Sequence, residues 1–272
     1  MQQEFHGRVR LQIDDGIARV TLIRGDRHNG VDIPMLQGML AAQRALRRRR
    51  DVRCAIIAGD GPSFCAGLDF KSVLRNKLPA LLLYLRLYSP VANMFQRFSV
   101  GWRQLPFPVI AAIHGNCFGA GIQLALGADV RIATADAQLS IMESKWGLVP
   151  DMGGTVLLRD VVSLDVAKEL TFTSRIVSGA DAAALGLVTH VADDPLDAAA
   201  ALAAEIATRS PDAVAAGKFL LQRSWQASPW GALALERRYQ RKVMMRKNQR
   251  ISVARQQRGG EAKPFAAREL KR

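Results

Sequence analysis

Two glycine-containing loops, each between an apolar strand and a helix, constrain the fold of this chain most strongly. Residues 63–69 (SFCAGLD) follow the apolar run 54–58, and residues 115–121 (GNCFGAG) follow the apolar run 109–113. Small residues at such junctions let a ligand approach the backbone, and N–H groups at a helix start lack intrahelical partners. Two such loops side by side would direct two N–H groups at one oxygen, as in an oxyanion hole. Taken alone, each loop is also explained as a simple tight turn with no binding role.

Repeated cycles of strand, loop and helix predict a layered α/β domain. Residues 8–23 alternate in hydrophobicity around Asp15-Gly16, which predicts a hairpin. Asp32 and Pro34 predict the start of a helix, and residues 70–103 also show a mainly helical pattern. Further strands are predicted at residues 54–58, 109–113, 130–133, 175–177 and 188–191.

The chain changes character near Asp193. Residues 195–250 are almost entirely helical in pattern, with alanine-rich faces and a break at Ser210-Pro211. We therefore predict an α/β core over residues 1–192 and a helical C-terminal module over residues 193–272, with no Gly/Ser linker between them. The last residues of the chain are charged and weakly patterned.

The formal net charge of +14 indicates a polyanionic ligand, nucleic acid or a basic solvated surface. Much of the excess lies at residues 47–50 and after Arg237. The first cluster ends a predicted helix, where positive charge favours the C-terminal dipole. A solvated basic face is therefore sufficient to explain it.

Cysteine usage and hydropathy predict the compartment. Cys54, Cys65 and Cys117 are widely spaced and form no CxxC pair, so neither a zinc site nor a disulfide framework is predicted. The longest apolar run, residues 78–85, is far shorter than the roughly 18 residues of a membrane span. The first residues lack the apolar segment of a secretory signal. A cytoplasmic protein with no membrane segment is expected.

Other common sites are not indicated. The glycines of residues 115–121 lack the GxGxxG spacing of a dinucleotide loop, and no GxxxxGK[ST] phosphate loop occurs. His114 precedes the second loop, but no serine or cysteine nucleophile motif accompanies it, which favours a structural histidine. The remaining histidines are scattered, so no metal site is expected.

Three motifs in order carry a family resemblance: SFCAGLDF, IHGNCFGAGIQLALGADVRIA and MESKWGLVPDMGGT. Together they resemble the central signature of the enoyl-CoA hydratase/isomerase (crotonase) family over roughly residues 10 to 190. The resemblance implies a crotonase-like spiral core of repeated ββα units with a helical C-terminal module. It also implies an acyl-CoA thioester substrate without a separate cofactor, since CoA is part of the substrate. The C-terminal module is then expected to support oligomerisation, as a homotrimer or a dimer of trimers.

The same resemblance assigns binding residues. In the family, the positions of Leu68 and Ala120 supply the two oxyanion N–H groups, and most members have glycine where Ala120 stands. Ala66 lies where the family binds the adenine and pantetheine end of CoA. The segment near Phe265 and Arg268 resembles the tail that contacts the nucleotide end, where a basic side chain would meet phosphates.

The acid/base positions depart from the family pattern. Typical hydratases carry two glutamates; the first position is Gln123, an amide that cannot act as a general base, and the second is Glu143. Asp151 stands where the family usually has glycine, and an aspartate there resembles the dienoyl-CoA isomerase branch, which normally keeps an acidic residue at the first position too. Alternatively, Asp151 is only a helix N-cap, and Glu143 is a surface carboxylate paired with Lys145.

Three functions remain open from the sequence. The first is an acyl-CoA enolate enzyme with Glu143 and Asp151 as catalytic carboxyls, supported by Gln123 and leaning to double-bond isomerisation. The second is an enoyl-CoA hydratase with Glu143 working alone. The third, from another class, is a basic RNA-binding relative. Glu143 favours the enzymes, whereas the arginine run 47–50 is the feature that favours RNA; we expect no nucleic-acid partner.

Overall fold

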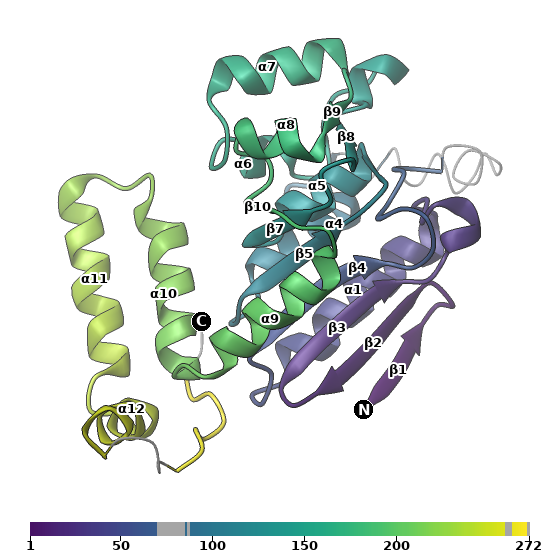
Figure 1. Ribbon diagram of the computed structural model, residues 1–272. Helices are drawn as coiled ribbons and strands as arrows, with labels where there is room; N and C mark the ends of the chain where they lie inside the picture. Colours follow the sequence, from purple (N-terminus) through teal and green to yellow (C-terminus); the bar gives the residue numbers. More distant parts are fainter. Residues whose placement is uncertain (70–84, 86–87, 259–262, 271–272) are drawn as a thin grey trace.

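The computed structural model describes residues 1–69, 85, 88–258 and 263–270 (Figure 1). Half of the predicted helical segment 70–103, namely residues 70–84 and 86–87, lies outside the described residues, as does nearly all of the apolar run 78–85. The strands are β1 (Gln2–Phe5), β2 (Val9–Asp14), β3 (Ile17–Leu22), β4 (Cys54–Gly59), β5 (Val109–Ile113), β6 (Asn116–Phe118), β7 (Val130–Ala133), β8 (Gln138–Ser140), β9 (Val177–Ser178) and β10 (His190–Val191).

The helices alternate with these strands in the first two thirds of the chain and replace them afterwards. The α-helices are α1 (Ile33–Arg47), α4 (Met94–Arg103), α5 (Ala120–Leu126), α6 (Gly154–Leu158), α7 (Leu164–Thr173), α8 (Gly179–Ala184), α9 (Pro195–Ala207), α10 (Pro211–Ser224), α11 (Pro229–Val243) and α12 (Lys247–Arg258). The 3₁₀ helices are η1 (Gly25–Arg27) and η3 (Glu143–Trp146). None of the helices in these described ranges is long and apolar enough to cross a membrane.

The central layer is a seven-stranded sheet in the order β1-β2-β3-β4-β5-β7-β10. The predicted hairpin is confirmed: β2 and β3 pair antiparallel around Asp15 and Gly16. From β3 onward the pairings are parallel. The carboxyl ends of β4 and β5 therefore lie at the same edge of the sheet, and the loops that follow these two strands start side by side.

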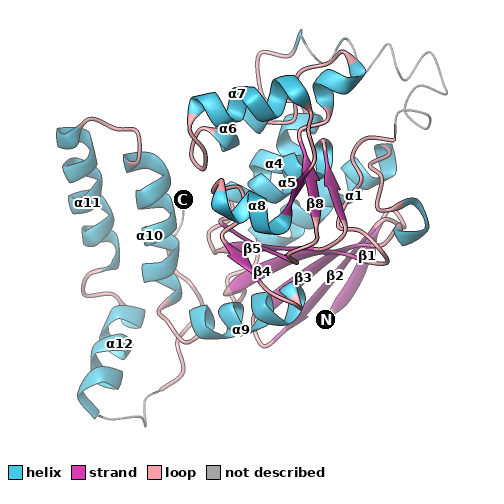
Figure 2. Cartoon of the chain, turned by 45° about the horizontal axis from the view of Figure 1, so that its top comes forward, coloured by secondary structure: helices cyan, strands magenta, loops and turns pink. Residues whose placement is uncertain are grey.

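Both faces of the sheet are covered by helices, as the continuous apolar runs require. Alternate residues of β4 point to opposite faces. Ala55 and Ile57 join the main core with α1, α4 and α5, whereas Cys54 and Ile56 pack with α9. Figure 2 shows α9 on one side of the sheet and the other three helices on the opposite side.

The predicted start of α1 is confirmed by its cap. The Asp32 carboxylate accepts the Met35 N–H at 2.8 Å, and Pro34 lies in the first turn. Because proline needs no hydrogen-bond partner for its nitrogen there, it suits this position. The helix ends at Arg47, so the arginine run begins in its last turn, as predicted.

A second, three-stranded sheet in the order β6-β8-β9 stands above the large one (Figure 2). Its presence corrects the prediction that residues 115–121 form only a loop, because β6 lies within them and pairs with β8. Along the chain, a strand of the large sheet is followed by a strand of the small sheet and then by a helix. This pattern occurs twice, as β5, β6 and α5 and then as β7, β8 and α6. The predicted strands near residues 175–177 and 188–191 correspond to the two-residue strands β9 and β10.

The helices after Asp193 divide into two groups. α9 packs on the large sheet, whereas α10, α11 and the tail share a small core around Phe219, Tyr239 and Leu270. Figure 1 shows α10 and α11 as a hairpin beside the core. Buried Lys218 of α10 ties this hairpin to the α/β core through an ion pair with Asp129, just before β7, at 2.7 Å. Residue 193 thus begins the helical region, while the packing changes after α9.

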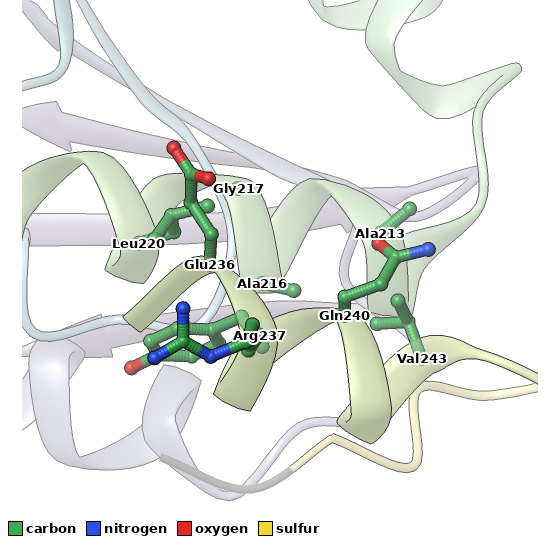
Figure 3. Close-up of a pocket in the computed structure, with 9 residues that line it drawn as sticks. Ala213, Ala216, Gly217, Leu220, Glu236, Arg237, Gln240 and Val243 are labelled. Atoms are coloured by element: carbon green, nitrogen blue, oxygen red, sulfur yellow. The ribbon is translucent and has the colours of Figure 1, made fainter. Parts of the chain in front are cut away.

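A groove of about 580 Å³ lies between α10 and α11. Figure 3 shows Ala213, Gly217 and Leu220 on one wall and Glu236 and Arg237 on the other. None of the candidate catalytic or CoA-binding residues lines it.

Candidate active site

The two loops predicted from the sequence lie against each other. Cys65 and Cys117 form a parallel bridge, in which the Cys65 N–H donates to Asn116 O at 2.9 Å and the Phe118 N–H donates to Cys65 O at 3.0 Å. The Phe64 N–H also donates to His114 O at 2.8 Å. Backbone hydrogen bonds therefore fix the position of one loop relative to the other.

Glycines make this close contact possible. Gly67 has a φ of +96°, and a Cβ atom there would lie 2.9 Å from Phe118 O and 3.8 Å from Ala120 N. Gly121 packs so closely against the Cys65 carbonyl that a Cβ atom there would clash with its oxygen. A side chain at either position would push the two loops apart.

Two N–H groups at this junction have no partner in the pairings that surround them. Leu68 lies opposite Val31 in a parallel bridge, but its own N–H takes no part in the hydrogen bonds of that bridge. These bonds run from the Val31 N–H to Gly67 O and from the Asp69 N–H to Val31 O. Ala120 is the first residue of α5, where a backbone N–H has no intrahelical acceptor. Among the described residues, the Leu68 N–H has no backbone acceptor outside its own element, and the Ala120 N–H has none within α5.

Glu143 lies next to the second loop and is buried, with 9% of its surface exposed. A Cβ atom on Gly119 would be 3.5 Å from its Oε1 atom. That oxygen accepts a hydrogen bond of 2.5 Å from Gln123 Nε2, whereas the buried Oε2 atom has no hydrogen-bond partner among the described residues. Burial raises the pKa of Glu143 above its ordinary value, and the charge of Asp151 acts in the same direction.

Gln123 connects Glu143 to the segment that carries Asp151. Its Oε1 atom accepts the Met152 N–H at 2.9 Å and the Gly154 N–H at 2.8 Å. The side chain is buried in α5. Sequence reasoning did not identify the Met152 and Gly154 donors, because backbone N–H groups carry no residue-type signal.

Asp151 is accessible to solvent, in contrast to Glu143. Partial burial of its carboxyl group nevertheless raises the pKa of Asp151. The prediction that it caps a helix is wrong, since α6 begins at Gly154 with Gly153 as its N-cap. Gln123 therefore links the segments that carry two carboxyl groups of raised pKa, one buried and one accessible.

The surroundings of Glu143, His114 and Cys65 decide which roles these side chains can have. Glu143 is not a surface carboxylate, and it forms no ion pair with Lys145 in the described part of the chain. His114 bonds through Nε2 to Gly61 O at 2.9 Å, as expected of a structural histidine. Burial raises the pKa of the Cys65 thiol to about 12, so this cysteine is not an activated nucleophile.

The CoA-binding candidates fall into two groups. Ala66 is exposed beside Leu68, and its N–H donates to His28 O at 2.9 Å. Phe265 lies at the other end of β4, where the Arg53 guanidinium stacks over its ring at 5.8 Å. Arg268, also at that end, is buried and donates from its guanidinium to the carbonyls of Leu270 and Arg49. Within one chain the tail therefore does not lie with the loops.

Known proteins match both the sequence and the fold. The family model described as Enoyl-CoA hydratase/isomerase matches residues 12–258. YngF of Bacillus subtilis (strain 168), whose name classes it with the enoyl-CoA hydratases/isomerases, is 32% identical over 240 residues, which are 87% of this chain and 90% of the relative. Human mitochondrial Delta(3,5)-Delta(2,4)-dienoyl-CoA isomerase is 33% identical over 217 residues, covering 74% of this chain and 64% of the relative.

The crystal structure of an enoyl-CoA hydratase from Bacillus anthracis has a TM-score of 0.86 to this chain at 26% identity. The match covers 94% of this chain and 98% of that one. The predicted fold class, an α/β crotonase-like core with a helical C-terminal module, is therefore confirmed.

Proposed function

Because this chain belongs to the enoyl-CoA hydratase/isomerase family, we propose that it isomerises a double bond of a dienoyl-type acyl-CoA through an enolate. The observation that carries the proposal is the composition of the acid/base site. A buried carboxyl group, Glu143, lies near an accessible one, Asp151, while the residue between them is the neutral Gln123. This site has two groups that exchange protons and one that only forms hydrogen bonds.

The oxyanion hole provides the first part of the mechanism. A thioester α-proton is weakly acidic, so its removal requires stabilisation of the negative charge that develops on the thioester oxygen. The Leu68 and Ala120 N–H groups are assigned to this oxygen. Such donors are fixed before the reaction begins and do not need to reorient as charge develops.

The two carboxyl groups would then move the proton. Asp151, the more accessible group, starts ionised and removes a proton from one carbon; the electron pair spreads over the conjugated chain to the thioester oxygen. Glu143, the more buried of the two groups, is assigned the protonated state and returns a proton to another carbon as the enolate collapses. The product has the same composition as the substrate, and the two carboxyl groups exchange protonation states.

Enoyl-CoA hydration is the second candidate, favoured by the similarity to hydratases. It would use Glu143 alone to activate water, since Gln123 cannot accept a proton. Incubation with 2-enoyl-CoA and 3,5-dienoyl-CoA, followed by product analysis, separates the two. Isomerisation yields a product of unchanged mass, whereas hydration adds one water. A hydroxyacyl product from 2-enoyl-CoA without any dienoyl isomerisation would contradict the proposal.

Asp151→Asn is expected to lower the turnover of a dienoyl-CoA by about 10²-fold or more, because an amide cannot accept the proton. The measurement is steady-state isomerisation, with binding of the acyl-CoA as the control for an intact site. Since Asp151 is exposed, the substitution should leave thermal stability nearly unchanged. Activity that survives this substitution would leave Glu143 as the sole acid/base group and favour hydration.

We further propose that the chain assembles as a trimer or a dimer of trimers. Several large apolar side chains are exposed on the isolated chain, among them Trp225 and Trp230 at the end of the α10–α11 hairpin and Val149 beside the candidate site. Such surfaces mark interfaces when they are contiguous. Light scattering at micromolar concentration should give at least three times the mass of one chain; a monomer would contradict this.

The position of the C-terminal tail indicates how it would reach CoA in such an assembly. Because Phe265 and Arg268 lie at the far end of β4 from Ala66, any contact of this tail with CoA would be made to the site of a neighbouring copy.

The cysteines bear on the compartment in which we propose that the protein works. The three cysteines are free and buried, which suits a reducing compartment such as the cytoplasm.

A further inference from the structure

We propose that Gln123 is a positioning residue that determines which oxygen of Glu143 carries the transferred proton and holds the Asp151 segment in register with it. This inference rests on the proposed function for its chemical meaning, but its geometric basis is independent. The Gln123 amide, which replaces the usual glutamate, thus has a positioning role.

The orientation of the amide is determined by its surroundings. The Met152 and Gly154 N–H groups, at 2.9 and 2.8 Å, are both donors, so the atom that faces them must be the carbonyl oxygen Oε1. The Nε2 atom must then face Glu143. A flipped amide would place two donors against two donors and leave Glu143 without this bond.

The amide in turn determines the state of each Glu143 oxygen. Nε2 donates to Oε1 at 2.5 Å, so Oε1 acts as an acceptor and does not carry a proton toward Gln123. The proton of neutral Glu143 is therefore on Oε2, the buried oxygen that has no partner among the described residues. Ordinarily an unpaired buried polar atom is costly, and a catalytic role is one accepted explanation for it.

The same side chain also holds the second carboxyl group. Met152 directly follows Asp151, and Gly154 begins α6, so both bonds to Oε1 fix the turn on which Asp151 lies. A single buried amide thus links η3, α5 and the start of α6. The charge of Asp151 raises the pKa of Glu143, so the separation of the two groups affects the protonation of Glu143.

Two substitutions separate the effect of Gln123 on Glu143 from its effect on the Asp151 segment. Gln123→Glu keeps an oxygen for the Met152 and Gly154 N–H groups, which favour its ionised form, but removes the donor to Glu143. The Glu143 proton should then turn toward residue 123, and the added negative charge should raise the Glu143 pKa by about one unit or more. Gln123→Met removes the hydrogen bond to Glu143 and both hydrogen bonds to the Met152 and Gly154 N–H groups. The Glu143 pKa should then rise because its carboxylate loses a donor, and the protein should also lose thermal stability.

A matched control is available in α1. Gln43 is also a buried glutamine, and it donates to the carbonyls of Arg97 and Phe98 at 3.1 and 3.2 Å without contacting either carboxyl group. Gln43→Met should therefore lower thermal stability while leaving the Glu143 pKa unchanged. A general loosening of the fold would affect the two methionine variants alike.

The decisive measurement is a ¹³C NMR titration of glutamate-labelled full-length protein, with the Glu143 signal assigned from Glu143→Gln. We expect a pKa shift of about one unit, a tenfold change in protonation, in both Gln123 variants and none in Gln43→Met. An unchanged Glu143 pKa in both Gln123 variants would overturn the inference. Because the titration needs no substrate, a shift without turnover of any dienoyl- or enoyl-CoA would refute the proposed function alone.

Discussion

Ala120→Pro is expected to reduce turnover of the acyl-CoA substrate by about 10²–10³-fold while the protein remains folded. The substitution removes one backbone N–H, the proposed oxyanion donor, and puts the proline Cδ atom in place of its hydrogen. Ala120 is the first residue of α5, where proline is well tolerated because its nitrogen needs no intrahelical acceptor. The preceding residue, Gly119, has no side chain to obstruct the proline ring.

The matched control is Leu164→Pro, which places proline at the first residue of α7. Leu164 is exposed and belongs to no part of the candidate site. Both variants should retain the circular dichroism spectrum of the parent protein, and only Ala120→Pro should lose kcat. Unchanged kcat in folded Ala120→Pro would mean that the Ala120 N–H does not stabilise charge in the transition state.

Glu143→Gln should lower turnover by about 10²–10⁴-fold, because the proton removed from the substrate can no longer be replaced from this position. Binding of the acyl-CoA should survive, since the amide has nearly the same shape as the carboxyl group. Steady-state kinetics and equilibrium binding of the substrate together measure the effect. Equal loss of binding and turnover would assign Glu143 to substrate recognition instead.

The stability of Glu143→Gln provides an independent check with a definite sign. Burial raises the pKa of Glu143, so folding becomes less favourable above the unfolded pKa, where the unfolded chain ionises this group and the folded protein resists doing so. The stability associated with this group is fully present below its unfolded pKa of about 4.3 and is lost as pH rises through the folded value. Urea unfolding should thus show the variant to be more stable than the parent at pH 8, with the difference vanishing near pH 4.

The sequence predicts β2 to β5 and β7 of the large sheet and the start of α1, but it does not predict β1. Residues 54–58 and 109–113 are continuous apolar runs because helices cover both faces of the sheet, and such runs read directly as buried strands. In contrast, β6 is three residues long within a glycine-rich loop and exists through pairing with β8, a partner that local pattern does not reveal. α9 is recognisable as a helix, but its packing on the sheet depends on tertiary structure.

The candidate site is predictable where residue type carries the chemistry. Glu143, Asp151 and Gln123 can be identified from motif positions, and the structure brings the three together. What the pattern omits is the set of backbone partners, such as the two N–H groups that orient Gln123. The burial of Arg268 is equally unpredictable, because its guanidinium bonds to carbonyl groups distant in sequence.

In the proposed reaction, this protein moves a proton along an acyl-CoA chain through two carboxyl groups. The most direct test is mass spectrometry of the product formed from a 3,5-dienoyl-CoA in D₂O. Because Asp151 takes up the substrate proton and Glu143 delivers one from solvent, we expect an isomerised product that carries one deuterium. Recovery of the dienoyl-CoA with its structure and mass unchanged, from protein that binds it, would contradict this mechanism.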